Sequence, residues 1–100
     1  MLIGNSTKRP NIESVRRIKK ALRTVLDLPE DTVMTVSQLA CLEQDCAPLE
    51  TVIGLLRSGE PQLQYKIHKA TDAVESGDLA LASAVWGYDT QRSAFEPFFT

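Results

Sequence analysis

Two cysteines, a nearby glutamate and the only histidine of the chain are residue types that bind metal ions. Cys41 and Cys46 have four residues between them and lie in residues 41–48, a segment that we expect to be a loop. Glu50 follows two residues after this loop. Two thiolates and the imidazole of His68 would be three of the four ligands of a tetrahedral zinc ion, with a carboxylate or a water as the fourth. The residue types therefore suggest a zinc site of Cys41, Cys46, His68 and Glu50.

Such a site requires that residues 49–57 and 61–68 fold back on each other as two antiparallel strands. Residues 61–68 alternate apolar and polar side chains, as a half-buried strand does. Residues 49–57 are ambiguous, because the proline before them and the glycine after them would suit a short helix. The β-branched run at 51–53 favours a strand instead. We favour the hairpin, in which Thr51 lies roughly opposite His68 and the imidazole is brought to the loop that holds the sulfurs.

The two cysteines have other interpretations. Free cysteine is commonly a small buried hydrophobe, and a single pair without a second pair or a second histidine is a weak zinc signal. A reactive thiol is the remaining alternative, with Cys46 as the better candidate, although the acidic residue before it disfavours a thiolate. Of the three, we favour unliganded structural cysteines and no cofactor, with zinc as the one cofactor to test.

Basic residues gather near the N-terminus. Residues 1–23 hold seven basic residues and one acidic residue, whereas the remainder holds four basic and twelve acidic residues, and the net charge is −2. The basic face of the expected helix consists of Arg16, Arg17, Lys19, Lys20 and Arg23. This face could contact an acidic protein or the phosphates of RNA. Nucleic acid is disfavoured, because the isoelectric point is about 5.3 and no aromatic residue is interleaved with the basic ones.

Two further places could bind a partner. Lys66 shares the polar face of strand 61–68 with His68, which makes this face either a contact for an anion or peptide or an ordinary solvated surface. Phe98 and Phe99 end an aromatic-rich segment. Aromatic side chains dominate interface energetics, so these two either dock on a partner or a second copy of the chain, or complete the core.

Hydrophobic spacing predicts the elements that position these residues. Apolar residues recur at three- and four-residue steps over residues 12–27, which predicts a helix with Asn11 as its N-cap. Residues 32–40 are rich in β-branched residues and predict a strand. Residues 70–86 return to helical spacing, with Gly77 as an interruption. The apolar stripe of the first helix comprises Ile12, Val15, Ile18, Leu22, Val25 and Leu26.

The element order is helix, strand, strand, strand, helix, which predicts an α+β fold. A three-stranded antiparallel sheet needs its apolar face covered, so we expect a two-layer sandwich with the helices packed on one face. Residues 1–10 are expected to be a flexible lead-in, residues 11–86 a single domain, and residues 87–100 an aromatic C-terminal tail. No run of apolar residues is long enough to cross a bilayer and no secretory signal is evident, which predicts a cytoplasmic protein without membrane contact.

The sequence favours a small accessory or adaptor domain that works by protein–protein contact. No phosphate-binding glycine loop, nucleophile elbow or triad pattern is present, so an enzyme is unsupported. The partner-binding candidates are Arg16, Arg17, Lys20, Arg23, Lys66, Phe98 and Phe99. The expected partner is another protein, for which an acidic protein is one candidate, or a second copy. A metal-handling domain is the alternative, followed by an RNA-associated domain that uses the basic helix.

Overall fold

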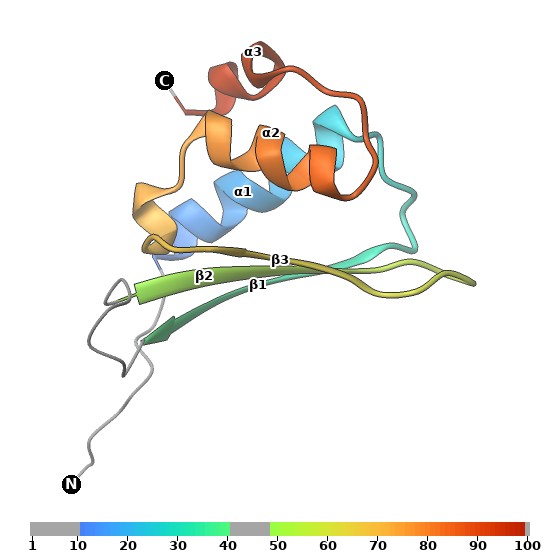
Figure 1. Ribbon diagram of the computed structural model, residues 1–100, viewed down its shortest axis with the longest axis horizontal. Coiled ribbons are helices and arrows are strands. Elements are labelled where there is room, and N and C mark those ends of the chain that lie inside the picture. Colours follow the sequence, from blue (N-terminus) through green and yellow to red (C-terminus); the bar gives the residue numbers. More distant parts are fainter. Residues whose placement is uncertain (1–10, 41–48, 100) are drawn as a thin grey trace, which may run out of the picture.

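The computed structural model describes residues 11–40 and 49–99, which form a two-layer α+β fold (Figure 1). The elements in chain order are α1 (Ile12–Val25), β1 (Val33–Ala40), β2 (Leu49–Leu56), β3 (Leu63–Ile67), the 3₁₀ turn η1 (Thr71–Ala73), α2 (Ser76–Val85), α3 (Arg92–Phe95) and the 3₁₀ turn η2 (Glu96–Phe98). The predicted fold class is confirmed, and the order of the elements roughly matches. The predicted flexible lead-in and the predicted loop that carries Cys41 and Cys46 lie outside the described residues.

The three strands form an antiparallel sheet in the order β1-β2-β3, so β2 is central and the other two are its edges. β1 and β2 are paired along all eight residues of each strand, without a bulge. β3 has five residues and pairs with the middle of β2, where Ile53 lies between Val36 and Tyr65. Alternate residues of every strand therefore point to the same side of the sheet.

α1 begins where the sequence predicts it. The side-chain oxygen of Asn11 accepts a hydrogen bond from the backbone N–H of Ser14 at 3.0 Å, which satisfies one of the free donors of the first turn. The helix ends at Val25, two residues before the predicted end. Its continuation is prevented because Asp27 takes a positive φ of 50° and Pro29 follows two residues later.

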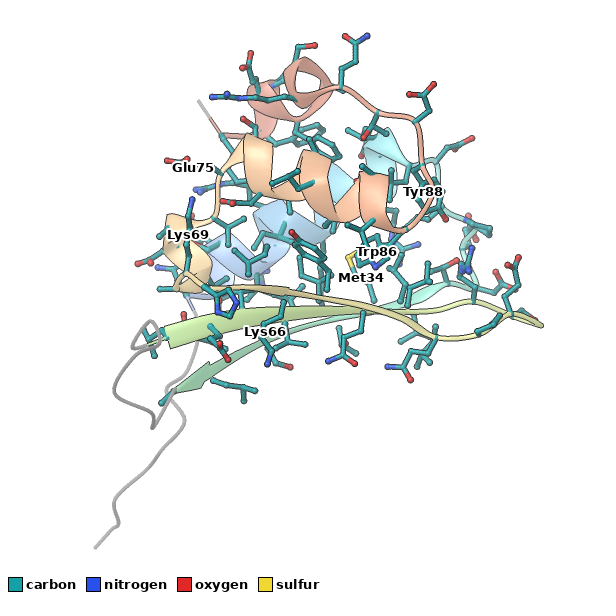
Figure 2. The ribbon with its side chains drawn as sticks, viewed as in Figure 1. Met34, Lys66, Lys69, Glu75, Trp86 and Tyr88 are labelled. Carbon is teal, nitrogen blue, oxygen red and sulfur yellow. The ribbon has the colours of Figure 1, made fainter. Side chains whose placement is uncertain are left out.

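The core lies between the sheet and the helices, which all cover the same face of the sheet (Figure 1). Its fully buried large apolar side chains are Ile18, Leu22, Ile53, Leu55, Leu79 and Phe95. Met34 and Trp86 also point into the space between the two layers (Figure 2). Ile12 was predicted on the apolar stripe but is 66% exposed, because it lies about 120° around the helix from Ile18. None of the described helices is both long and apolar enough to cross a membrane.

The first turn of α2 is fixed by a capping box. Glu75 is the N-cap, and its backbone N–H donates to the Asp78 carboxylate at 2.8 Å. Gly77 was expected to interrupt the helix, but it lies within this first turn. The interruption instead precedes the helix, where η1 and the two extended residues Val74 and Glu75 come before α2.

A small group of buried polar side chains joins η1 to the sheet. The Gln38 side-chain oxygen accepts a hydrogen bond from the backbone N–H of Thr71 at 2.8 Å. The Thr51 hydroxyl donates to the carbonyl of Lys69 at 2.8 Å and lies 3.3 Å from the Thr71 hydroxyl. Gln38 and Thr51 are cross-strand partners in β1 and β2, so the network links both strands to the segment that follows β3. We refer to it below as the Gln38–Thr51–Thr71 network.

Replacing the central hydroxyl of this network should destabilise the fold. In Thr51→Val the shape is nearly unchanged, but the partly buried carbonyl of Lys69 loses its donor, which should lower the free energy of unfolding by about 1–3 kcal/mol. Chemical denaturation measures this change. The matched control is Ser37→Ala on the exposed side of β1, which should stay within about 0.5 kcal/mol of the parent. Equal stability of the two variants would contradict the structural role of the network.

Candidate functional site

The face of the sheet that points away from the helices is not covered by any described element (Figure 1). Three aliphatic side chains are exposed on it, Val33 at 52%, Leu39 at 41% and Leu56 at 45%. Val33 and Leu56 are direct cross-strand partners, so two of them form one apolar pair. Thr35 and Ser37 lie on the same side of β1 and are exposed as well. This uncovered face therefore mixes aliphatic and small hydroxyl side chains near β1.

Charged side chains occupy the opposite edge of the uncovered face. The Glu50 carboxylate lies 2.8 Å from the imidazole Nδ1 of His68 and 3.8 Å from the ammonium of Lys66. Glu50 is only 12% exposed at its side chain, whereas His68 and Lys66 are more than half exposed. The three side chains come from β2 and from β3 or the residue directly after it. The structure thus brings together two of the four predicted zinc ligands, Glu50 and His68.

The pairing that achieves this differs by one residue from the predicted hairpin. Thr51 was expected roughly opposite His68, but it pairs with Ile67 and its side chain points into the core. A shift of one residue exchanges the two faces of a strand, so Glu50 replaces Thr51 beside the imidazole. Cys41 and Cys46 lie outside the described residues, and residues 11–40 and 49–99 contain no group of three His, Cys, Asp or Glu side chains placed to hold a metal. The zinc site stays a prediction.

β1 is an edge strand without the features that usually protect an edge. Its eight residues include no charge, no proline and no glycine. Natural edge strands are commonly short, charged, bulged or interrupted by proline, because their free N–H and C=O groups otherwise pair with another chain. β3, the opposite edge, has five residues and carries Lys66. Among the described residues, β1 makes its backbone hydrogen bonds with β2 alone, so its outer edge is open.

The predicted basic face of α1 is divided between structural and exposed residues. Arg23 donates hydrogen bonds to the carbonyls of Pro29 and Thr32, at 3.2 and 2.9 Å, and so holds the connection from α1 to β1. The guanidinium of Arg17 lies over the ring of Phe99, 5.8 Å from its centroid. The remaining basic residues of the face, Arg16, Lys19 and Lys20, are exposed. Contact of this face with an acidic protein or RNA stays a prediction.

Most aromatic side chains near the C-terminus pack into the fold. Phe95 is completely buried, and Phe98, Phe99, Trp86 and Tyr88 are partly buried against the core. Phe98 and Phe99 therefore cover apolar surface of this chain, which is one of the two roles expected for them. Their use in binding a partner is not tested.

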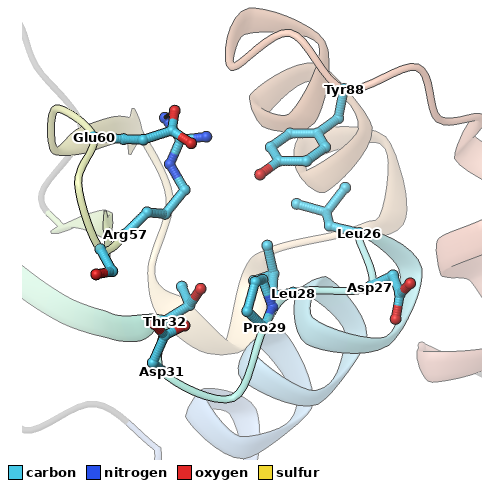
Figure 3. A pocket seen from close by; sticks show the side chains of 10 residues that line it. Leu26, Asp27, Leu28, Pro29, Asp31, Thr32, Arg57, Glu60 and Tyr88 are labelled. Atoms are coloured by element: carbon cyan, nitrogen blue, oxygen red, sulfur yellow. Dashed lines mark ion pairs between the residues drawn. The ribbon is translucent and has the colours of Figure 1, made fainter.

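A cavity of about 430 Å³ opens at the end of the sheet where β1 begins and where β2 turns into β3 (Figure 3). Its lining residues are Leu26, Asp27, Leu28, Pro29, Asp31, Thr32, Arg57, Ser58, Glu60 and Tyr88. Arg57 forms an ion pair with Glu60 at 3.3 Å across one wall. The Thr32 hydroxyl and Arg57 Nε are buried and have no hydrogen-bond partner in the part of the chain that the structure describes. No sequence pattern indicated this cavity, because its lining comes from three separate segments.

α2 exposes a second apolar surface that the sequence did not single out. Leu81 is 60% exposed and Val85, one turn later, is 67% exposed. The helix is apolar on nearly all sides, so its periodicity alone did not indicate which side would be buried. Leu79 and Ala82 of the same helix pack into the core, so α2 has both a buried and an exposed apolar side.

Comparisons with protein-family models, with curated proteins and with solved structures found no match for this chain.

Lys66 and Lys69, which flank His68, have different surroundings (Figure 2). Lys66 lies on the uncovered face, whereas the Lys69 ammonium reaches the first turn of α2. There it lies 3.0 Å from the Asp78 carboxylate and 3.7 Å from that of Glu75. The hydrogen bond to Asp78 is the main reason why the pKa of Lys69 is raised above its ordinary value of 10.5. Lys69 thus ties the end of β3 to the start of α2.

This raised pKa predicts an alkaline loss of stability that Lys69→Met should abolish. The folded state holds the Lys69 proton more tightly than the unfolded chain does. The stabilisation is therefore fully present below pH 10.5 and is lost as pH rises through the raised pKa. The free energies of unfolding of parent and variant, measured against pH, should differ by a constant amount near neutrality and converge in alkaline solution. Lys19→Met, which removes no ion pair to a described residue, should stay within about 0.5 kcal/mol of the parent. A difference that is independent of pH would contradict this role.

Proposed function

We propose that this chain is a small non-enzymatic adaptor domain that binds another protein through β1 and the uncovered face beside it. The observation that carries the proposal is the open, uncharged edge of β1. In an edge strand of eight residues, the backbone N–H and C=O groups of every second residue point away from the sheet and can pair with a partner. Those of the other residues bond to the neighbouring strand. A partner strand there would extend the sheet by main-chain hydrogen bonds.

The side chains beside this edge specify the chemistry of the partner. Val33 and Leu39 stand at the two ends of the exposed side of β1, with Thr35 and Ser37 between them. A partner strand that places aliphatic residues at the ends and small hydroxyl residues at the centre would match this side. Charged partner residues would find no counterion along β1, because none of its residues is charged. The partner is therefore an extended, uncharged protein segment.

Photo-crosslinking tests this function without knowledge of the partner. A photoreactive benzoylphenylalanine replaces Thr35 on β1 in the full chain, which is expressed in its own cells and irradiated. We expect a discrete crosslinked species at this position, because the partner strand would lie within contact distance of the exposed side chain. The control carries the same photoreactive residue in place of Lys19, which is exposed on α1. The adduct is then identified by mass spectrometry.

Two results would contradict the proposal. The first is the absence of any adduct from position 35. The second is the same set of adducts from positions 35 and 19, which would show random encounters in place of a specific contact. An adduct specific to position 35 supports the proposal whether the captured protein is a different chain or a second copy.

Metal handling is the second candidate, and the contact of Glu50 with His68 favours it. These two side chains lie 2.8 Å apart on an exposed surface. The segment with Cys41 and Cys46 joins the paired ends of β1 and β2, where Leu39 lies opposite Glu50. The chain therefore leaves the cysteine segment just before Glu50, whose carboxylate contacts the imidazole. Thiolate, imidazole and carboxylate together are a donor set that zinc accepts.

Cobalt titration of the purified, reduced chain tests the metal candidate. Bound Co²⁺ should produce thiolate charge-transfer absorption, which should disappear in Cys41→Ser and in Cys46→Ser. Loss of a residue that only supports a metal ligand typically weakens metal binding by roughly ten- to a hundredfold. His68→Gln should weaken cobalt binding by at least this much, since it removes a direct ligand. Lys66→Gln, which alters a neighbouring side chain that is not a ligand type, is the control and should bind as the parent does. A flat spectrum for the parent chain would remove this candidate.

A further inference from the structure

β1 is complementary to itself when two copies are placed antiparallel. On its exposed side, Val33 and Leu39 stand three residues before and three residues after Val36, and Thr35 and Ser37 stand one residue to either side. A twofold axis through Val36 therefore places Val33 opposite Leu39 of the second copy and Thr35 opposite Ser37. The aliphatic residues meet each other and the hydroxyl residues meet each other. No like charges oppose, because the strand has none.

On the core side of β1, the same axis pairs side chains that are already buried or half-buried within each copy. Met34 would stand opposite Gln38 of the second copy, and Val36 would stand opposite its own equivalent. Each of the four pairs joins two odd-numbered or two even-numbered residues. Side chains that point to one face of the sheet in one copy therefore point to the same face in the other copy. The helices of both copies would then cover the same face of a continuous sheet, and both uncovered faces would adjoin.

Neighbouring registers are less favourable. An axis through Ser37 would place Thr35 opposite Leu39, which mixes hydroxyl and aliphatic residues. An axis through Thr35 would place Leu39 opposite Asp31, an exposed acid in the turn before the strand. Only the axis through Val36 pairs like with like along the whole exposed side. The opposite edge, β3, is shorter than β1 and would bring the charged Lys66 into any contact between strands.

We infer that β1 pairs antiparallel with β1 of a second copy of this chain, with Val33 opposite Leu39 and Thr35 opposite Ser37, so that two three-stranded sheets form one sheet of six strands. The inference rests on the proposed function, because it names the partner strand. A contact of one strand from each copy is small, so the dimer should dissociate on dilution.

Two double variants that differ at a single position test both the dimer and its register. In Thr35→Lys/Ser37→Glu, the introduced lysine of each copy lies opposite the introduced glutamate of the other copy, so that two oppositely charged pairs form. Thr35→Lys/Ser37→Lys places lysine opposite lysine twice, which is destabilising for directly opposed residues. Both positions are exposed in the single chain, so both variants should fold, and circular dichroism checks this.

Light scattering after size-exclusion chromatography, over concentrations that bracket the micromolar range, gives the mass of each species. The parent should shift from 11.1 kDa towards twice that mass as concentration rises. The lysine–glutamate variant should dimerise at least as well, and the lysine–lysine variant should remain at 11.1 kDa. Val85→Lys, on the apolar outer side of α2, is the control and should dimerise as the parent does.

Each other outcome overturns the inference. A parent chain of constant monomer mass would exclude the dimer. Equal behaviour of the two double variants would exclude the proposed register. Loss of the dimer in Val85→Lys alone would assign the contact to α2. The crosslinking experiment separates these failures from a failure of the proposed function. A monomeric parent that still captures a different protein at position 35 retains the adaptor role and loses only the self-pairing.

Discussion

The buried Gln38–Thr51–Thr71 network is the constraint on which the arrangement of the two layers depends. Gln38 and Thr51 belong to paired strands, and both bond to the segment that leaves β3 for α2. These polar groups are satisfied only in the observed register, because a slip of one residue would turn Thr51 to the uncovered face. An unsatisfied polar group in a core is costly, so the network selects one pairing of the strands. It thereby also decides which face of the sheet the helices cover.

That choice leaves the other face with two unlike halves. Near β1 it is uncharged, with exposed Val33 and Leu39, whereas near β3 it carries the Glu50, Lys66 and His68 group. The uncharged half suits a contact made by backbone pairing and apolar side chains. The charged half suits ions or polar ligands. The adaptor and metal hypotheses thus use different halves of one surface, and either can hold without the other.

The residues near the chain ends show how side chains that look functional are used by the fold. Arg23 holds the turn between α1 and β1 through two backbone carbonyls, and Arg17 stacks on Phe99. Phe95 fills the centre of the core. A small domain has little apolar material to spare, so aromatic residues near its end are readily drawn into the core. The partner surface that we propose is accordingly a strand edge and not the basic or aromatic clusters.

The sequence by itself determined the position and type of α1, β1 and β3, whereas residues 49–57 stayed ambiguous between strand and helix and α3 and η2 were not predicted. Period-two alternation marked residues 61–68, β-branched residues marked 32–40, and Asn11 marked the helix start, because these signals arise from local backbone geometry. Tertiary structure alone decided the register that places Glu50 beside His68, the exposure of Ile12, and the side of α2 that is buried. It also decided that β1 is an edge strand, with no further strand beside it among residues 11–40 and 49–99. These properties depend on contacts between segments distant in the chain, and the pattern within one segment carries no information about its partner.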